Sequence, residues 1–358
     1  MSRPIRAVIH TQSLYHNLQR VRDLAPNTKI MAVIKADAYG HGLTDVAKTL
    51  SFANAFAVAS IDEAIIVDDA LEDKKPICLL EGVFEQQELE EASGRQFRLV
   101  VHNHDQVEML ENISVNNPFS VWLKIDTGMN RLGFAPTDFK AVHQRLLQAE
   151  SVADVSLMSH LACADDINSP KTKEQKKLFD DTTDGILSNR SLANSAGIMQ
   201  WPNTRYEWVR PGIMLYGSSP LLNRTADELD LKPAMTLSSK LVQVQQIQQG
   251  QSVGYGATWT ADKDTLIGVI ACGYGDGYPR HAVTGTPVLV NNRRVPLVGR
   301  VSMDMMTVDL SGQSDAKMGD PVVLWGEGLS VDEVAARAGT IGYELLCQVT
   351  RRVPRVMD

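Results

Sequence analysis

The sequence has little cysteine, no concentrated basic tract and no long apolar run. Its four cysteines are far apart and form no Cys-x-x-Cys spacing, so no zinc site, redox dithiol or disulfide framework is indicated. No stretch approaches the roughly 20 apolar residues that span a bilayer, and the N-terminus lacks the apolar core of a signal peptide. Lys and Arg total 35 against 43 Asp and Glu, a net charge of −8, which disfavours a nucleic-acid partner. We therefore expect a cytoplasmic protein that binds neither nucleic acid nor membrane.

The composition is that of an ordinary folded protein. The chain has 358 residues, of which 44% are hydrophobic and 22% charged, so it can bury a large core and is not disordered. His102 and His104 stand two residues apart, but no cysteine or third histidine accompanies them, and we predict no metal site. This length suits two or three average domains, or one barrel with an additional domain.

From residue 7 to about 220, short apolar runs alternate with amphipathic segments. The runs predict strands near residues 7–10, 29–36, 55–60, 76–82, 97–103, 120–126, 155–162, 191–197 and 208–217. Apolar strands that alternate with amphipathic helices indicate a parallel sheet covered by helices. About eight such units favour a (β/α)8 TIM barrel over an open doubly wound sheet. The absence of a strand followed by Gly-x-Gly-x-x-Gly supports the barrel.

After about residue 230 the pattern changes to short runs rich in β-branched residues, separated by turn signals. This pattern predicts a mainly antiparallel β domain. Asn291 and Asn292 stand between two such runs and predict a tight hairpin, because asparagine tolerates positive φ. We expect a barrel over residues 1–228 and a β-rich domain over residues 229–358.

One predicted strand end carries an unusual lysine. The run MAVIKA passes directly into DAYGHG, which places Lys35 at the end of an apolar strand and glycines in the loop beyond it. A buried lysine must be neutral, paired or covalently engaged, and lysines of lowered pKa form Schiff bases. The alternative is a lysine at the strand edge that extends its amine to solvent.

Polar residues also follow the other predicted strands. Because the carboxyl ends of barrel strands meet on one face, these residues are candidates for a shared site, and Ser195 with its small neighbours could present N–H groups to a phosphate. The residues are Arg131, His160, Asp165, Asn194, Ser195, Arg210, Gly212 and Ile213.

The segment VIKADAYGHG, with Lys35 and Tyr39, resembles the pyridoxal-phosphate attachment site of alanine racemases. Further motifs similar to that family follow in its order: KIDTGMNRLGF, SHLACAD, WVRPGIMLYG, VGYGATW, GYGDGYPRHA, VGRVSMDMMTVDL and GYELLC. The resemblance spans nearly the whole chain. It implies a homodimeric isomerase that uses pyridoxal 5'-phosphate to interconvert L-alanine and D-alanine, for peptidoglycan or for D-alanine catabolism.

The resemblance also implies the catalytic residues. Lys35 would hold the cofactor as an aldimine and act as one base, and Tyr255 would act as the second base on the opposite face of the α-carbon. Two bases on opposite faces move a proton through racemisation most directly. His160 and Arg210 would support the tyrosine, and Arg210 would face the pyridine nitrogen.

The other implied roles concern the cofactor, the substrate and the entrance. Tyr255, Met303 and Asp304 would reach the site of the other subunit, and Lys124 would be open to carbamylation. The implied cofactor contacts are Lys35, Tyr39, His160, Asn194, Ser195, Arg210, Gly212, Ile213 and Tyr343. The implied substrate contacts are Arg131, Met303 and Asp304, and the implied entrance residues are Asp165, Tyr274 and Arg280.

Three other functions compete with this interpretation. A decarboxylase of the same fold and cofactor would need a different constellation, and the motifs VGYGATW and SMDMM favour the racemase. A non-catalytic cofactor carrier would have no second domain with a tyrosine base. A broad-specificity racemase is usually exported, and this chain shows no signal peptide.

Overall fold

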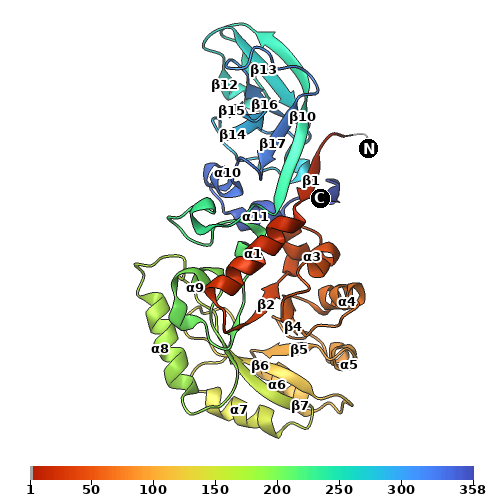
Figure 1. Cartoon of the computed structure of the whole chain (residues 1–358), viewed down its shortest axis with the longest axis vertical. Coiled ribbons are helices and arrows are strands. Elements are labelled where there is room, and N and C mark those ends of the chain that lie inside the picture. The colour runs from red at the N-terminus through yellow and green to blue at the C-terminus, as the bar shows by residue number, and fades with distance from the viewer. Residues whose placement is uncertain (1–2) are drawn as a thin grey trace.

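Eight parallel strands close into a barrel in the lower half of the molecule (Figure 1). The computed structural model describes residues 3–358. The barrel strands are β2 (Lys29–Val33), β3 (Ala55–Val58), β4 (Ile77–Leu79), β5 (Arg98–Val101), β6 (Phe119–Lys124), β7 (Val152–Met158), β8 (Arg190–Ser191) and β9 (Trp208–Val209). The predicted (β/α)8 barrel is thereby confirmed, and the open sheet is excluded because β9 pairs with β2.

Side chains fill the interior of the barrel, which is therefore a core and not a pore. Met31, Cys78, Trp122 and Trp208 belong to this buried cluster, and the two tryptophan rings meet edge to face. The apolar character of strands such as β3, in which every residue is buried, follows from this double coverage by the interior and the helices.

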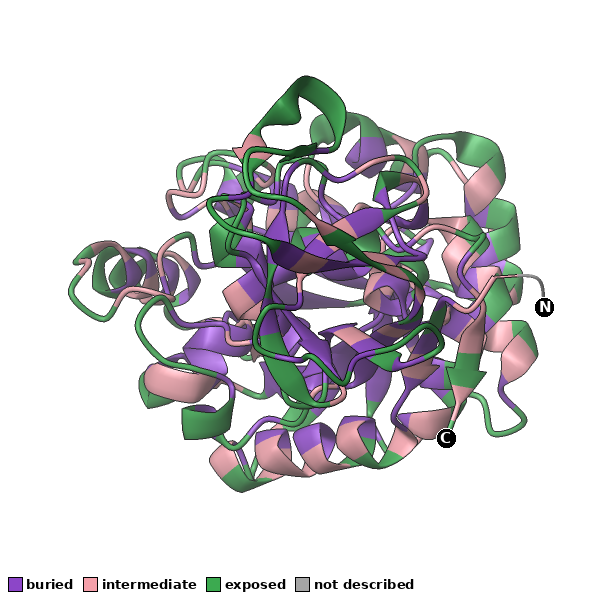
Figure 2. Cartoon of the chain, turned by 90° about the horizontal axis from the view of Figure 1, so that it is seen from above, coloured by how far each residue is buried: buried purple, intermediate pink, exposed green. Residues whose placement is uncertain are grey.

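Helices cover the outside of the barrel, with buried inner faces and exposed outer faces (Figure 2). They are α1 (Thr11–Leu24), α3 (Leu43–Thr49), α4 (Ile61–Ala70), α5 (Gln86–Gly94), α6 (His104–Glu111), α7 (Phe139–Gln148), α8 (Lys171–Thr183) and α9 (Ser195–Gln200). The short segment α2 (Lys35–Gly40) follows β2 and is left-handed over most of its length. Within residues 3–358, none of the helices combines the length and apolar character needed to cross a membrane.

A second sheet of eight strands forms the upper half of the molecule (Figure 1). Its strands are β1 (Arg6–Ile9), β10 (Met235–Ile247), β13 (Thr265–Ile270), β14 (Pro287–Val290), β15 (Arg293–Val298), β16 (Met306–Asp309), β17 (Pro321–Trp325) and β18 (Arg355–Met357). The strand pairs are antiparallel except for β1 with β18. The small hairpin β11 (Ser252–Val253) and β12 (Trp259–Thr260) and the helices α10 (Val331–Arg337) and α11 (Gly342–Cys347) complete this part.

The hairpin predicted at Asn291 and Asn292 is present between β14 and β15. Both asparagines have positive φ, 49° and 59°, as a two-residue turn between twisted strands requires. The predicted mainly antiparallel character of this part of the chain is confirmed.

The apolar run at residues 7–10 does form a strand, β1, but this strand does not join the barrel. It pairs antiparallel with β10 and parallel with β18, both in the second sheet. The expectation that this run belongs to the barrel is therefore wrong. A strand followed by an amphipathic helix looks the same in sequence whichever sheet the strand enters. The alternation of strands and helices therefore could not reveal that β1 belongs to the second sheet.

Candidate active site

Lys35 lies just beyond the carboxyl end of β2, where the backbone turns left-handed. The four residues from Ala36 to Tyr39 all have φ between 51° and 56°. Such a conformation costs an L-residue roughly 1–2 kcal/mol, so four in succession must be held by their surroundings. The strand that the sequence predicts through residue 36 therefore ends earlier, at Val33.

Two charged residues hold this left-handed turn. Glu63 on α4 accepts hydrogen bonds from the backbone N–H of Ala36 at 2.7 Å and of Ala59 at 2.9 Å. Arg355 on β18 donates from Nε to the carbonyl oxygen of Gly40 at 2.7 Å. Sequence reasoning missed both residues, because neither stands in a motif or at the end of a barrel strand.

Positive groups gather at this end of the barrel. Lys124, buried at the end of β6, has its pKa lowered to about 8, first by burial and then by the charges of Arg210, Arg131 and Lys35. The same cationic groups contribute to lowering the pKa of His160 far below its usual value, after burial, which is the largest cause. Mutually repelling cations of this kind indicate a site built for an anionic ligand.

Arg210 is buried behind His160 and is fixed by several acceptors. It follows β9 and donates to the carbonyl oxygen of Ser159 and to Oγ of Ser191, both at 2.5 Å. Its Nη2 also lies 3.4 Å from Nδ1 of His160. Burial lowers the pKa of Arg210 to about 10, so the guanidinium stays protonated near neutral pH.

A cradle of small and hydroxyl groups lies beside these cations. The N–H of Gly212 donates to Oγ of the buried Ser195 at 2.9 Å. A Cβ on Gly212 would lie only 2.6 Å from Oη of Tyr39, so a larger residue here would force the end of the Tyr39 side chain to shift. Tyr343, from α11 of the second part of the chain, places its ring 6.2 Å from that of Tyr39. Hydroxyls and N–H groups around a position without a side chain suit a phosphate.

The remaining predicted barrel residues border this cradle or the open mouth. Asn194 caps α9 by accepting from the N–H of Gly197 at 3.0 Å, and Ile213 begins the short 3-10 helix Ile213–Tyr216. Arg131 is exposed in the loop after β6, and Asp165 is partly exposed after β7.

The predicted residues of the second domain lie on its surface. The side chains of Tyr255 and Met303 are 70% and 53% exposed, and that of Tyr274 is 39% exposed. Arg280 is exposed and Asp304 is partly so. Among residues 3–358, no hydrogen bond or aromatic contact joins Tyr255 to the barrel residues. The single chain therefore gathers the predicted barrel residues but leaves Tyr255, the predicted second base, exposed.

The residues present at the barrel mouth fit pyridoxal 5'-phosphate. A lysine stands beside a cradle of hydroxyl and N–H groups in which a Cβ on Gly212 would crowd Tyr39, and the surrounding groups carry excess positive charge. The fold and this donor set define a pyridoxal-phosphate enzyme of the barrel plus β-domain type.

Comparison with known proteins gives the family. Residues 9–220 match the family model described as alanine racemase, N-terminal domain, and residues 234–357 match alanine racemase, C-terminal domain. The chain is 51% identical over 355 residues to the alanine racemase of Nitrosococcus oceani, covering 99% of each protein. It is 48% identical over 348 residues to the biosynthetic alanine racemase of Escherichia coli, covering 97% of each.

Solved structures agree. The crystal structure of the biosynthetic alanine racemase from Pseudomonas aeruginosa superposes with a TM-score of 0.97 at 48% identity, covering 99% of each chain. The alanine racemase from Acinetobacter baumannii gives a TM-score of 0.93 at 39% identity, covering 99% of this chain and 100% of the other. The chain belongs to the alanine racemase family. It is thus an isomerase that interconverts L-alanine and D-alanine with pyridoxal 5'-phosphate as cofactor.

Proposed function

We propose that this chain moves the α-proton of alanine between Lys35 and Tyr255, and that two subunits of a homodimer supply the two residues to each site. The observation that carries this proposal is the unequal state of the two residues. Lys35 lies among the other cations at the barrel mouth, which all come from the same chain. Tyr255, in contrast, is 70% exposed on the surface of the second domain. A base that works on a buried α-carbon needs a covered position, which a second copy of the chain would provide.

The proton transfers follow from the two side chains. When bound, pyridoxal 5'-phosphate withdraws electrons from the substrate and so makes the α-proton more acidic. The amine of Lys35 takes or returns a proton on one face of the α-carbon, and the phenol oxygen of Tyr255 does so on the other. In one direction one residue starts without the proton and takes it, while the other starts with a proton and gives it. After this turnover the two protonation states are interchanged, so the reverse reaction uses the same two groups.

The pair His160 and Arg210 serves the tyrosine in this mechanism. A tyrosine has a pKa near 10, so it acts as a base near neutral pH only when its anion is stabilised. His160 is neutral, since its pKa is held far below the usual value, and therefore it can donate a hydrogen bond but brings no charge. The charge comes from Arg210, which contacts the imidazole at 3.4 Å and would also face the cofactor's ring nitrogen.

The other residues divide into cofactor and substrate contacts. The phosphate is held by the cradle residues Tyr39, Ser195, Gly212, Ile213 and Tyr343, with Asn194 bordering it. The guanidinium of Arg131 and the N–H of Met303 hold the substrate carboxylate beside Asp304, and Lys124 supports Arg131. Asp165, Tyr274 and Arg280 narrow the entrance, which favours a substrate as small as alanine.

The wider setting is proposed on the same basis. We assign the barrel to residues 1–228, apart from the strand β1, which pairs in the second sheet, and the second domain to residues 229–358. Relatives named biosynthetic support a role in supplying D-alanine for peptidoglycan. Four free cysteines, two of them buried, are compatible with a reducing compartment such as the cytoplasm.

Incubation of the purified chain with L-alanine in deuterated water tests the reaction. We expect D-alanine to form with deuterium at the α-carbon. Release of carbon dioxide would identify a decarboxylase instead, and deuterium exchange with larger amino acids at similar rates would identify a broad-specificity racemase.

Complementation tests the shared site. Lys35→Ala and Tyr255→Ala chains should each be inactive alone. A mixed dimer should regain one working site, with Lys35 from one chain and Tyr255 from the other. Inactivity of the mixed dimer, with its mass confirmed, would contradict a site shared between subunits.

A further inference from the structure

The loop that presents Met303 is packed, backbone on backbone, against the loop that presents Tyr274. The N–H of Tyr274 donates to the carbonyl oxygen of Ser302 at 3.0 Å, and the N–H of Gly275 donates to that of Met303 at 2.9 Å. A Cβ on Gly273 would lie 2.2 Å from the oxygen of Ser302, so only glycine permits this approach. The two loops are therefore packed together as one unit.

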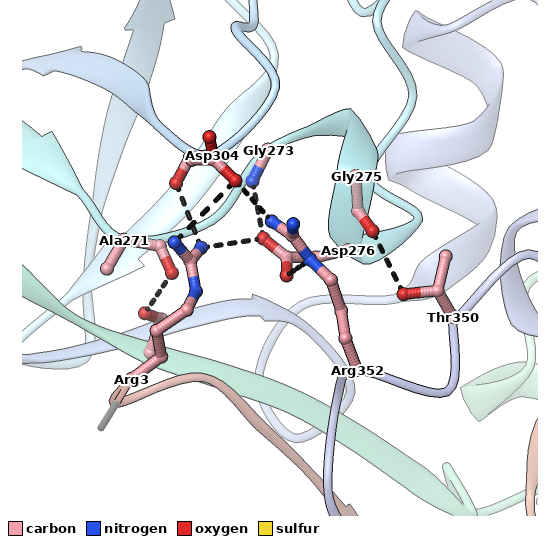
Figure 3. Close-up of polar contacts among 9 residues, drawn as sticks. Arg3, Ala271, Gly273, Gly275, Asp276, Asp304, Thr350 and Arg352 are labelled. Atoms are coloured by element: carbon pink, nitrogen blue, oxygen red, sulfur yellow. Dashed lines mark hydrogen bonds and ion pairs between the residues drawn. The ribbon is translucent and has the colours of Figure 1, made fainter. Parts of the chain in front are cut away.

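A buried carboxylate lies at the base of this unit (Figure 3). The side chain of Asp276 is 0% exposed and accepts from Nη2 of Arg3 at 2.9 Å and from Nε of Arg352 at 2.7 Å. It also accepts from the N–H of Gly273 at 3.0 Å. A carboxylate buried in this way is stable only while its cationic partners stay in place.

Arg352 connects this carboxylate to the substrate loop. While its Nε pairs with Asp276, its Nη2 donates to Oδ1 of Asp304 at 2.6 Å, so one guanidinium bridges both loops (Figure 3). Arg3 adds a bond from Nη2 to the carbonyl oxygen of Asp304 at 3.0 Å. A guanidinium can bridge two carboxylates with separate N–H groups in a fixed plane, whereas an ammonium offers one point charge.

We propose that Arg352 is a positioning residue for substrate binding, which acts by holding the Met303–Asp304 loop through Asp276 and Asp304. This inference rests on the proposed function, in which Met303 binds the substrate carboxylate in the partner's site. Arg352 touches neither substrate nor cofactor in this scheme. Loss of Arg352 leaves Lys35 and Tyr255 in place, but the Met303 N–H that binds the substrate carboxylate is no longer held in position. The loss therefore raises KM more than it lowers kcat.

The first test uses homodimers. In Arg352→Gln we expect KM for alanine to rise roughly tenfold, because a displaced Met303 N–H binds the substrate carboxylate less well, with a smaller change in kcat. Arg352→Lys should recover part of the loss, because it keeps one of the two ion pairs. The matched control is Arg294→Gln, which removes a bidentate pair with Glu333 in the same domain, 2.6 and 2.9 Å, away from this unit. Propionate, a carboxylate without the amino group, should inhibit Arg352→Gln more weakly in proportion to the rise in KM.

The second test separates positioning from general loss of stability. In the mixed dimer of Lys35→Ala and Tyr255→Ala chains, only the Lys35→Ala chain donates a second-domain loop to the working site. Arg352→Gln placed in that chain should raise KM, whereas the same change in the Tyr255→Ala chain alters the loop that faces the inactive site. A structural defect would act alike from either chain.

The outcomes are distinct. An inactive mixed dimer without any Arg352 change overturns the shared site itself. An active mixed dimer with equal KM for the two placements overturns the positioning role while leaving the shared site intact. A KM rise confined to the donating chain, with partial recovery by Arg352→Lys, supports the inference.

Discussion

Arg210 Nη2 lies 3.4 Å from His160 Nδ1, and this contact determines where the imidazole carries its proton. A guanidinium nitrogen only donates, so Nδ1 accepts and the proton of the neutral ring is on Nε2. Burial and the surrounding cations hold the pKa of His160 well below its usual value. His41 is the second buried histidine kept neutral: its Nδ1 donates to the carbonyl oxygen of Tyr39 at 2.9 Å, and burial lowers its pKa from 6.5 to about 4.

Folding stability should therefore fall with acid below pH 6.5. Because the folded pKa of His41 is depressed, the unfolded chain binds the proton more readily between pH 6.5 and 4, and stability is lost as pH falls through this window. The loss for His41 alone is about 3 kcal/mol by pH 4. Urea denaturation at a series of pH values measures it. His41→Gln should flatten this dependence, whereas the exposed His104→Gln should not; equal slopes in the two variants would refute the assignment.

Glu63→Gln should loosen the left-handed turn after Lys35. One carboxylate oxygen accepts the N–H of Ala36 and the other that of Ala59, and an amide can accept only one of them. The other N–H then faces an NH2 group and loses its hydrogen bond to Glu63, which costs about 1 kcal/mol for groups that are not fully buried. We expect a lower urea midpoint and faster loss of cofactor on dialysis, followed by absorbance near 420 nm, an approximate wavelength for the bound cofactor. Glu90→Gln, at an exposed position of α5, is the matched control. Unchanged cofactor retention would argue against a role for Glu63 at this turn.

Gly212→Ala should weaken cofactor binding more than it weakens the fold. The new methyl group would lie 2.6 Å from Oη of Tyr39, which must swing away from the cradle. We expect the Kd for pyridoxal 5'-phosphate to rise roughly tenfold, which is about 1.4 kcal/mol of binding free energy. Gly312→Ala, where a Cβ meets nothing within 4 Å, should leave the Kd unchanged. Equal effects from both substitutions would count against the cradle.

Lys124 should react with carbon dioxide. Its pKa of about 8 leaves an appreciable neutral fraction near pH 7.5, and a neutral amine is the form that adds carbon dioxide. The carbamate would replace a repelled cation by an anion among Arg131 and Arg210. With labelled bicarbonate, carbon NMR of the wild-type chain should show a carbamate signal that Lys124→Ala lacks. A signal that persists in Lys124→Ala would assign it to another lysine.

Much of the fold was predictable because its pattern is local. Short apolar runs that alternate with amphipathic segments predicted the barrel, and Asn291 with Asn292 predicted the hairpin, since each pattern depends on only a few adjacent residues. The place of β1 was not predictable in this way. Its partners β10 and β18 are more than two hundred residues further along the chain, and no local property of residues 7–10 selects one sheet over the other.

The candidate site likewise has features that the local sequence predicts and features that it does not. Lys35, His160, Ser195 and Arg210 follow strands, so barrel geometry predicts that they gather, and the structure places them at one end of the barrel. The left-handed turn and the residues that hold it could not be read from the sequence. They depend on contacts between distant segments, such as Arg355 with Gly40, and on a run of positive φ in residues that ordinarily avoid it.

The pairing of β1 in the second sheet has a consequence for the order in which the strands can pair during translation. β1 is synthesised before the barrel strands, but its first partner, β10, follows the whole barrel, and its other partner, β18, comes more than a hundred residues later still. During translation the barrel can therefore close while β1 waits unpaired beside it. The second sheet is completed only when β18 is added. From then on β1, which precedes the barrel strands, is paired with β18, which follows all the other strands of the second sheet.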